Sequence, residues 1–323
     1  MKNTSRNAAM APKTNASKPS RRAPASTAVS MTVESYIDAA RSAATKKAYA
    51  ADLAHFLANG GKLPATPQQL CAYLANLAAT LAVATIERRL IGIHRAHQNQ
   101  NLTSPALHMS VRQTMQGIRR TLGTAQRRAR AITKDNLLEL LTLIAQQRPL
   151  KAARDRALLL TGFAGAFRRS ELVSLKCEDI SLHDSGMEIL LRRSKTDQEG
   201  AGRTVFIPFA RGSLCPVRAL AEWQEVSGIN SGYIFRAVSR HDTLGVSPLS
   251  GQSVSLILKA ALLKAGKDHL GMSGHSLRAG FVTAAVLAGL QPYQIRAQTG
   301  HRSDVTLAKY IRPLEKRNIP SLL

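Results

Sequence analysis

Gly274-His275-Ser276-Leu277-Arg278-Ala279-Gly280, at residues 274–280, is the stretch from which the fold of this 323-residue chain is best predicted. His275 and Arg278 are three residues apart and therefore share one face of a helix's first turn, where backbone N–H groups and the helix dipole favour an anion. Thr299-Gly300-His301 follows, and Tyr310 stands nine residues beyond that histidine on the last predicted helix. Simpler interpretations exist for both features, namely a capped helix with a hydrogen-bonded histidine and a tyrosine of the core.

Two segments earlier in the chain carry further polar residues of interest. In Phe167-Arg168-Arg169-Ser170-Glu171-Leu172, Arg168 and Glu171 share a helix face, which an ordinary intrahelical ion pair would also explain. Lys195 stands in a polar loop between two predicted strands, where a lysine is usually a solvated charge.

Together these segments resemble, in order and spacing, the signature of the tyrosine recombinase (phage integrase) family: R-x-S-E-L, a lysine on a hairpin, H-x-x-R, then G-H and a tyrosine. The resemblance covers nearly the whole chain from about residue 31. Residues 273–278 and 310–312 are most similar to the Cre branch, whereas His301 follows the wider family, because Cre has tryptophan there. The R-x-S-E spacing selects Arg168; with a shifted helix phase, Arg169 would take its place.

The resemblance implies a site that attacks a DNA phosphodiester, and its chemistry accounts for the residue types. Negative charge on the phosphate grows in the five-coordinate transition state, so two guanidinium groups, those of Arg168 and Arg278, clamp it. Tyr310 is the implied nucleophile, and a phenol with a pKa of about 10 needs a base and nearby positive charge. His275 is the candidate base, and His301 would hydrogen-bond a nonbridging oxygen.

The implied general acid is Lys195, which protonates the leaving 5′-oxygen, while Glu171 holds the constellation in place. Because the bond energy is kept in a 3′-phosphotyrosine, religation needs no ATP, and we expect neither a cofactor nor a metal ion. The resemblance further implies that four protomers hold two double-stranded DNA sites with paired inverted repeats. Strands would then be exchanged through a Holliday junction, with an accessory protein as an optional partner.

The composition indicates a polyanionic partner. Lys and Arg number 45 against 20 Asp and Glu, which gives a formal net charge of +25, so nucleic acid is the first expectation. Apolar runs are far below spanning length and the basic N-terminus lacks a signal-peptide core, so we expect no membrane and a cytoplasmic, nucleoid-associated protein. Three widely separated cysteines predict neither a disulfide framework nor a zinc site.

Hydrophobic periodicity predicts a mainly α chain with a small β-sheet in two domains, and the resemblance implies that these domains form a C-shaped clamp. Helical spacing from Met31 to Gly60 predicts one unbroken helix, and strands at 187–192 and 203–208 predict a β-hairpin. The predicted parts are a disordered basic tail at 1–30, a helical core-binding (SAM-like) domain at 31–122, a basic linker at 123–131 and a mixed catalytic domain at 132–323. The tail either touches phosphates or is a solvated leader.

Basic residues outside the predicted active site are expected to contact DNA phosphates. They lie on the linker and on the helices of the first domain, and they are Arg127, Arg128, Arg130, Arg119, Arg120, Arg88 and Arg89.

Other functions fit parts of the pattern. A type IB topoisomerase or a telomere resolvase uses a similar active site, but the compact size and helical first domain favour a recombinase. A non-catalytic DNA-binding protein would explain the charge, yet it would not need Tyr310 in register with His301. Integration, excision and cointegrate resolution remain alternatives. The apolar residues after Pro313 are too few for a core, so this tail either docks on a neighbouring protomer or folds back on its own domain.

Overall fold

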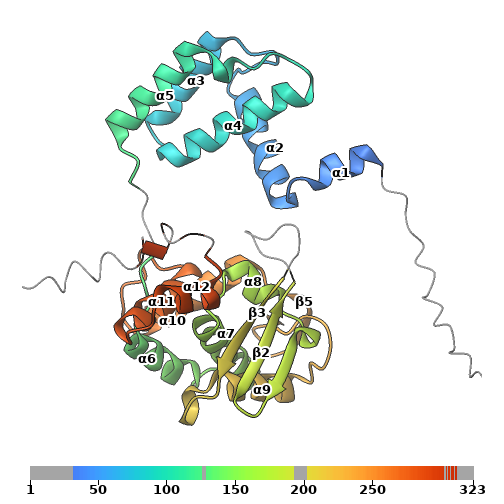
Figure 1. The fold of residues 1–323 in the computed structure, drawn as a ribbon, viewed down its shortest axis with the longest axis vertical. Coiled ribbons are helices and arrows are strands. Elements are labelled where there is room, and N and C mark those ends of the chain that lie inside the picture. Colours follow the sequence, from blue (N-terminus) through green and yellow to red (C-terminus); the bar gives the residue numbers. More distant parts are fainter. Residues whose placement is uncertain are drawn as a thin grey trace, which may run out of the picture. The chain divides into compact units, whose positions relative to one another are not determined.

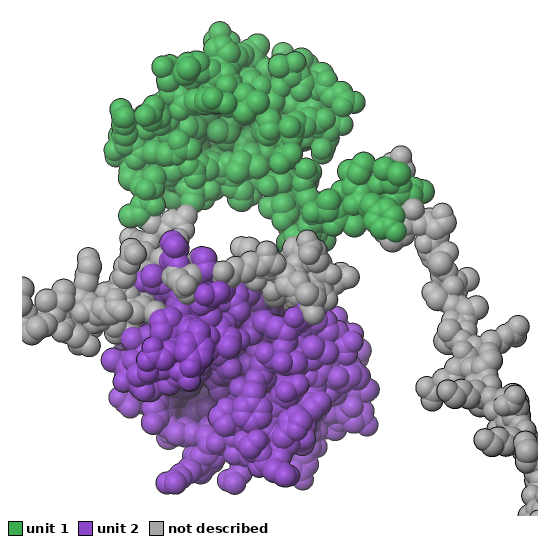
Figure 2. All heavy atoms as spheres, in the orientation of Figure 1, with its two compact units in different colours: residues 1–126 green, residues 127–323 purple. Residues whose placement is uncertain are grey.

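The computed structural model describes residues 32–125, 129–192 and 202–301, followed by Ser303, Val305, Leu307, Ala308 and Tyr310. It consists of two compact units, residues 1–126 and 127–323 (Figure 2). Four of the features expected from the sequence lie outside the described residues: the tail 1–30, Arg127 with Arg128, Lys195, and the segment 311–323.

The described part of unit 1 is entirely helical (Figure 1). Its core is formed by apolar side chains from four helices, among them Phe56, Leu74, Ile86 and Met115. The elements are α1 (Val33–Ala39), α2 (Ala43–Ala58), α3 (Pro67–Ala78), α4 (Val83–Asn99), the 3-10 helix η1 (Pro105–Leu107) and α5 (Met109–Leu122).

Local sequence signals account for the ends of these helices. Thr66 caps α3, and Gln69 completes a capping box by accepting from the Thr66 backbone N–H. The prediction of a single helix from Met31 to Gly60 is wrong, because the chain leaves the helical path at residues 40–42. Ser42 instead caps a new helix by accepting a hydrogen bond from the backbone of Thr45.

Unit 2 is a mainly helical domain with small antiparallel sheets. Helix α7 (Pro149–Ala164) lies in its middle and is buried along most of its length (Figure 1). The other helices of this unit are α6 (Lys134–Ile144), α8 (Arg169–Ser174), η2 (Cys177–Asp179), η3 (Gly212–Leu214), α9 (Pro216–Ser227), α10 (Gly251–Lys264), α11 (His275–Leu287) and α12 (Pro292–Thr299).

The predicted β-hairpin is confirmed as β2 (Gly186–Leu191) paired with β3 (Arg203–Pro208), in a register that sets Leu191 opposite Arg203. A third strand, β1 (Ile180–His183), adds to the outer side of β2. A separate two-stranded sheet is formed by β4 (Arg236–Val238) and β5 (Leu244–Pro248). The predicted fold class, mainly α with a small sheet, is therefore confirmed.

Three chain segments far apart in the sequence meet around the end of α7 and position polar side chains there. The turn after α7 leads through Ala166 into α8, and α7 packs against α11. Helix α12 lies against both α11 and β3. Within the described ranges, no helix is long and apolar enough to cross a membrane.

Candidate active site

Arg278 is the buried centre of a polar cluster in unit 2. Its side chain lies on α11 and is 2% exposed. The Nη1 atom donates to the carbonyl oxygens of Ala166 at 2.9 Å and Thr299 at 2.6 Å. The buried Nη2 atom makes no hydrogen bond to any described residue. An unpaired buried guanidinium nitrogen is costly, so this atom is a strong candidate to bind an anionic oxygen.

The charge of Arg278 survives its burial. Desolvation, followed by repulsion from Arg168, lowers the pKa of Arg278 to about 10, while Glu171 and Tyr310 act in the opposite direction. A group with that pKa remains protonated at neutral pH. The cluster therefore carries a positive charge in a place from which water is largely excluded.

Arg168 and Glu171 form an ion pair at the start of α8. The Nη1 atom of Arg168 lies 2.5 Å from Oε1 of Glu171, whose Oε2 accepts from the Arg168 backbone N–H at 2.9 Å. Glu171 is 2% exposed, and its buried carboxylate holds both the backbone and the side chain of Arg168. Arg169 is exposed and its stem packs near Gly251 and Gly274. Arg168, selected by the spacing, is thus the one that lies beside Arg278.

His301 is held in one tautomer by the end of α12. The hydroxyl of Thr299 lies 2.7 Å from the Ile295 carbonyl and must donate its only proton there. Thr299 Oγ1 therefore accepts from Nδ1 of His301, at 2.9 Å. In the neutral ring, Nε2 is then an acceptor.

The surroundings of His301 strongly favour that neutral ring. Burial lowers its pKa to about 3, and the positive charges of four nearby arginines reinforce this effect. These charges belong to Arg278 on α11, Arg168 before α8, Arg203 on β3 and Arg296 on α12.

Tyr310 completes the cluster. Its ring centroid lies 5.5 Å from that of His301, with the planes tilted by 39°. The tyrosine ring packs against the small apolar cluster of Val282, Ala285, Ile295 and Leu307. The structure therefore brings together five of the residues selected from the sequence, which are Arg168, Glu171, Arg278, His301 and Tyr310.

His275 occupies a different kind of position. It is the first residue of α11 and is exposed, and its backbone N–H donates to the Ser273 hydroxyl at 3.2 Å. It lies one helical turn before Arg278, at the helix N-terminus that favours anions. Lys195 lies outside the described residues, so its placement stays a prediction.

The arginines expected to contact DNA have varied environments. Arg88 and Arg89 both turn toward the buried Asp52 on α2, and the Arg89 side chain is only 15% exposed. Arg89 also contacts the ring nitrogen of His55 at 2.8 Å. On the remaining helices and linker, Arg119 pairs with Glu87, Arg120 is exposed, and Arg130 pairs with Asp268.

Arg203 joins the cluster although the sequence alone did not single it out. Its Nη1 donates to the Gln298 carbonyl at 2.9 Å, and its Nη2 lies 3.7 Å from Glu171 Oε2. Burial lowers the pKa of Arg203, and Glu171 partly offsets this. Its only sequence signal is a basic residue at the first position of the strand that follows the lysine-bearing loop.

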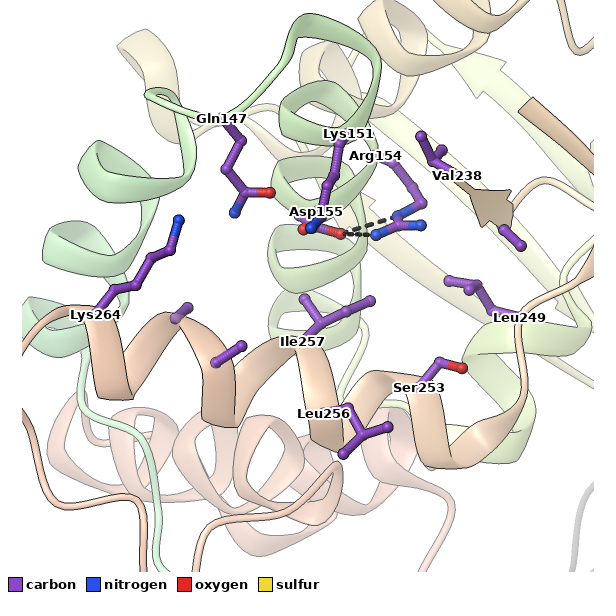
Figure 3. A pocket seen from close by; sticks show the side chains of 13 residues that line it. Gln147, Lys151, Arg154, Asp155, Val238, Leu249, Ser253, Leu256, Ile257 and Lys264 are labelled. Carbon is purple, nitrogen blue, oxygen red and sulfur yellow. Dashed lines mark hydrogen bonds and ion pairs between the residues drawn. The ribbon is translucent and has the colours of Figure 1, made fainter. Parts of the chain in front are cut away.

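A separate hollow in unit 2 lies between α7, α10 and β4 (Figure 3). Its volume is about 350 Å³, and the Arg154–Asp155 pair on its wall is buried. Burial raises the pKa of Asp155, against the neighbouring Arg154 charge. None of the residues in the Arg278 cluster lines this hollow.

Comparisons with known proteins show the family of this chain and agree with its fold. Residues 130–317 match the phage integrase family. An integrase/recombinase xerD homolog from Selenomonas ruminantium is 38% identical over 276 residues, which cover 83% of this chain and 81% of that protein. The chain therefore belongs to the phage integrase family, the tyrosine site-specific recombinases. The finer assignment to a Cre-like branch stays a prediction.

Solved structures with the same fold include two recombinases bound to DNA. One is XerH site-specific recombinase bound to palindromic difH substrate in a post-cleavage complex. The match covers 78% of this chain and 70% of the XerH chain, with a TM-score of 0.59 and 19% identity. The other is a lambda integrase dimer bound to a COC′ core site. That match covers 91% of this chain and 99% of the integrase chain, with a TM-score of 0.60 and 19% identity. At these identities the likeness shows the fold alone.

Proposed function

We propose that this recombinase cleaves double-stranded DNA by attack of the Tyr310 hydroxyl on a backbone phosphate, which leaves a 3′-phosphotyrosine and a free 5′-hydroxyl. The observation that carries the proposal is the buried Arg278, whose Nη2 has no described partner and which lies in the cluster with Arg168, His301 and Tyr310. A buried cation of this kind is suited to an oxygen whose negative charge grows in the transition state.

Each remaining residue has one step in the proposed reaction. Arg168 and Arg278 bind the nonbridging oxygens, and Glu171 holds Arg168 in place. His275 takes the phenolic proton as Tyr310 attacks, and Lys195 gives a proton to the leaving 5′-oxygen. In religation the 5′-hydroxyl of another strand attacks the phosphotyrosine, and both protons return. The phosphoester bond is conserved, so the cycle consumes no ATP.

His301 binds a nonbridging oxygen in this proposal, which requires a proton on Nε2. Its Nδ1–H is committed to Thr299, and cationic neighbours suppress a second proton while no anion is bound. A bound phosphodiester offsets those charges and raises the pKa of His301. We therefore expect DNA binding to be coupled to proton uptake at His301.

The DNA partner and assembly belong to the same proposal. The core-binding domain (31–122) and the catalytic domain (132–323), joined by the linker 123–131, grip opposite sides of a duplex as a C-shaped clamp. Exposed arginines such as Arg120 contact phosphates. Four protomers on two sites with paired inverted repeats exchange strands through a Holliday junction, in the nucleoid. Relatives bound to DNA core sites, one of them as a dimer, support the partner class.

The test uses a nicked duplex carrying a site that the protein selects from a random DNA pool. Cleavage next to the nick releases a short strand, so the covalent adduct accumulates and is seen on a denaturing gel. We expect the adduct, followed by Holliday junctions when two intact sites are supplied. Efficient relaxation of a supercoiled plasmid without any site would favour a topoisomerase, and site binding without an adduct would favour a non-catalytic DNA-binding protein.

A further inference from the structure

Arg203 docks on the C-terminal end of α12. Its Nη1 donates to the carbonyls of Gln298 at 2.9 Å and Ala297 at 3.5 Å, and its Nη2 to that of Thr299 at 3.5 Å. The last carbonyls of a helix lack partners within the helix and carry partial negative charge, so a guanidinium stabilises this end. The same Thr299 carbonyl also receives Arg278. One helix end therefore fixes two arginines immediately before His301.

Arg203 reaches a third element through Glu171. Its Nη2 lies 3.7 Å from Glu171 Oε2, while Arg168 holds the other carboxylate oxygen. The buried carboxylate is thus shared by two guanidinium groups, which hold it in one orientation. Because Arg203 is the first residue of β3, these contacts tie the base of the 193–201 loop to α8 and α12.

Gly300 leaves the room for this arrangement. It has φ of +66° and ends α12 in the left-handed conformation. A Cβ at this position would stand 2.7 Å from Nε of Arg203. The residue before His301 therefore accommodates the Arg203 side chain directly, in addition to turning the backbone.

We propose that Arg203 is a positioning residue of the cleavage step, which orients His301 and Arg278 on the phosphate by anchoring the end of α12 and Glu171. The inference rests on the proposed function, because it assigns Arg203 a part in that reaction. A strand-end arginine that only adds positive charge toward DNA would need neither the contacts with the α12 carbonyls nor the contact with Glu171.

The experiment compares Arg203→Ala and Arg203→Lys with a matched control, Arg192→Ala. Arg192 flanks the same loop at the end of β2, but its side chain is 61% exposed and pairs with Asp179, away from α12. We expect Arg203→Ala to keep affinity for a selected duplex within about threefold and to lower the single-turnover cleavage rate at least about tenfold. Arg192→Ala should cleave at the wild-type rate.

Two readouts separate positioning from general stability. In a double-mutant cycle, Arg203→Ala should lower the cleavage rate far less in a His301→Gln background than in the wild type, because both substitutions act through His301. In the pH profile of the cleavage rate, the limb that reports His301 is the one that disappears in His301→Gln. This limb should move to higher pH in Arg203→Ala, since one cation that lowers the pKa of His301 is gone. In Arg203→Lys, which keeps the charge, the rate should fall while the limb stays.

Failure of this inference differs from failure of the proposed function. If the wild type forms no adduct, the proposed function is wrong. If the wild type cleaves, three results would each show that Arg203 is not a positioning residue. The first is a cleavage rate of Arg203→Ala equal to that of Arg192→Ala, and the second is an equal loss of affinity and cleavage rate in Arg203→Ala. The third is a loss of rate in Arg203→Ala that adds fully to the loss in His301→Gln. Should Arg203→Ala fail to fold, Arg203→Lys gives the same comparison, because it disturbs the contacts with α12 and leaves the charge.

Discussion

The Nη1 atom of Arg278 lies 2.6 Å from the carbonyl oxygen of Thr299, so the most buried arginine of the site is anchored by the end of the helix that leads into His301. The same nitrogen donates to Ala166, whose φ of +49° is unusual for a residue with a side chain. Backbone from the turn after α7 and from the end of α12 thus surrounds one guanidinium, and its second terminal nitrogen is left for a ligand.

Arg278→Lys should lose far more cleavage than affinity. A lysine keeps the charge but cannot reach two carbonyls and a phosphate together, and losing one such donor costs about 3 kcal/mol, roughly a hundredfold in rate. Affinity, which is spread over many phosphates, should stay within about threefold. The measurements are single-turnover cleavage and equilibrium binding on one duplex. Equal losses in both would make Arg278 a DNA-positioning residue instead.

Thr299→Val should disturb His301 without changing any charge. The substitution keeps the shape of the side chain but removes the hydroxyl that accepts from Nδ1. With the ring free to rotate, we expect cleavage to fall by about tenfold, within the usual effect of a lost orienting hydrogen bond. In a His301→Gln background the same change should have little further effect. A full loss in both backgrounds would contradict the orienting role.

His301 should make the folded protein less stable in acid. Its folded-state pKa, about 3, lies below the usual value of 6.5. His301 is therefore protonated below pH 6.5 in the unfolded chain but only below about pH 3 in the folded chain. The free energy of unfolding falls as the pH drops through this window. We expect a loss on the order of 3 kcal/mol between pH 7 and pH 4 from this group. Denaturant unfolding of the wild type and His301→Gln checks it; parallel pH curves for the two would contradict the prediction.

Truncation after Pro313 should leave a folded protein that binds DNA but assembles poorly. The removed segment carries Leu314, Ile319, Leu322 and Leu323, whose burial on a neighbouring protomer would contribute roughly 3 to 5 kcal/mol before ordering costs. Sedimentation with the site measures assembly, and thermal unfolding without DNA measures stability. A large fall in melting temperature with normal assembly would favour a tail that folds back on its own domain.

Much of the fold follows from local signals in the sequence. Helix starts at Thr66, Thr133 and Ser250 are all capped by these side chains, and the alternating strands around the lysine-bearing loop form the expected hairpin. The break at Ser42 was missed because the apolar spacing continues across it. Strand β1 and the β4–β5 pair were missed because they are short and largely exposed, with little alternation.

The site was less predictable wherever contacts join distant segments. Arg168 immediately precedes α8 and Glu171 is the third residue of that helix, so their spacing of three residues indicates the pairing, although Arg168 itself is extended and not helical. Arg203 reaches α12 across more than ninety positions of sequence, which no periodicity can report. Arg89 was expected to contact DNA phosphates, but its side chain turns inward toward Asp52 on another helix. Helix phase gives the direction of a side chain and says nothing of a buried partner elsewhere.

Tyr310→Phe on the nicked duplex shows whether Tyr310 is the nucleophile. The substitution removes one hydroxyl and keeps the ring that packs beside His301, so folding and affinity should stay within a few-fold of wild type. We predict an abundant adduct for the wild type, with the DNA fragment mapped to Tyr310, and no adduct for Tyr310→Phe. An adduct of normal yield with the phenylalanine variant would contradict this prediction.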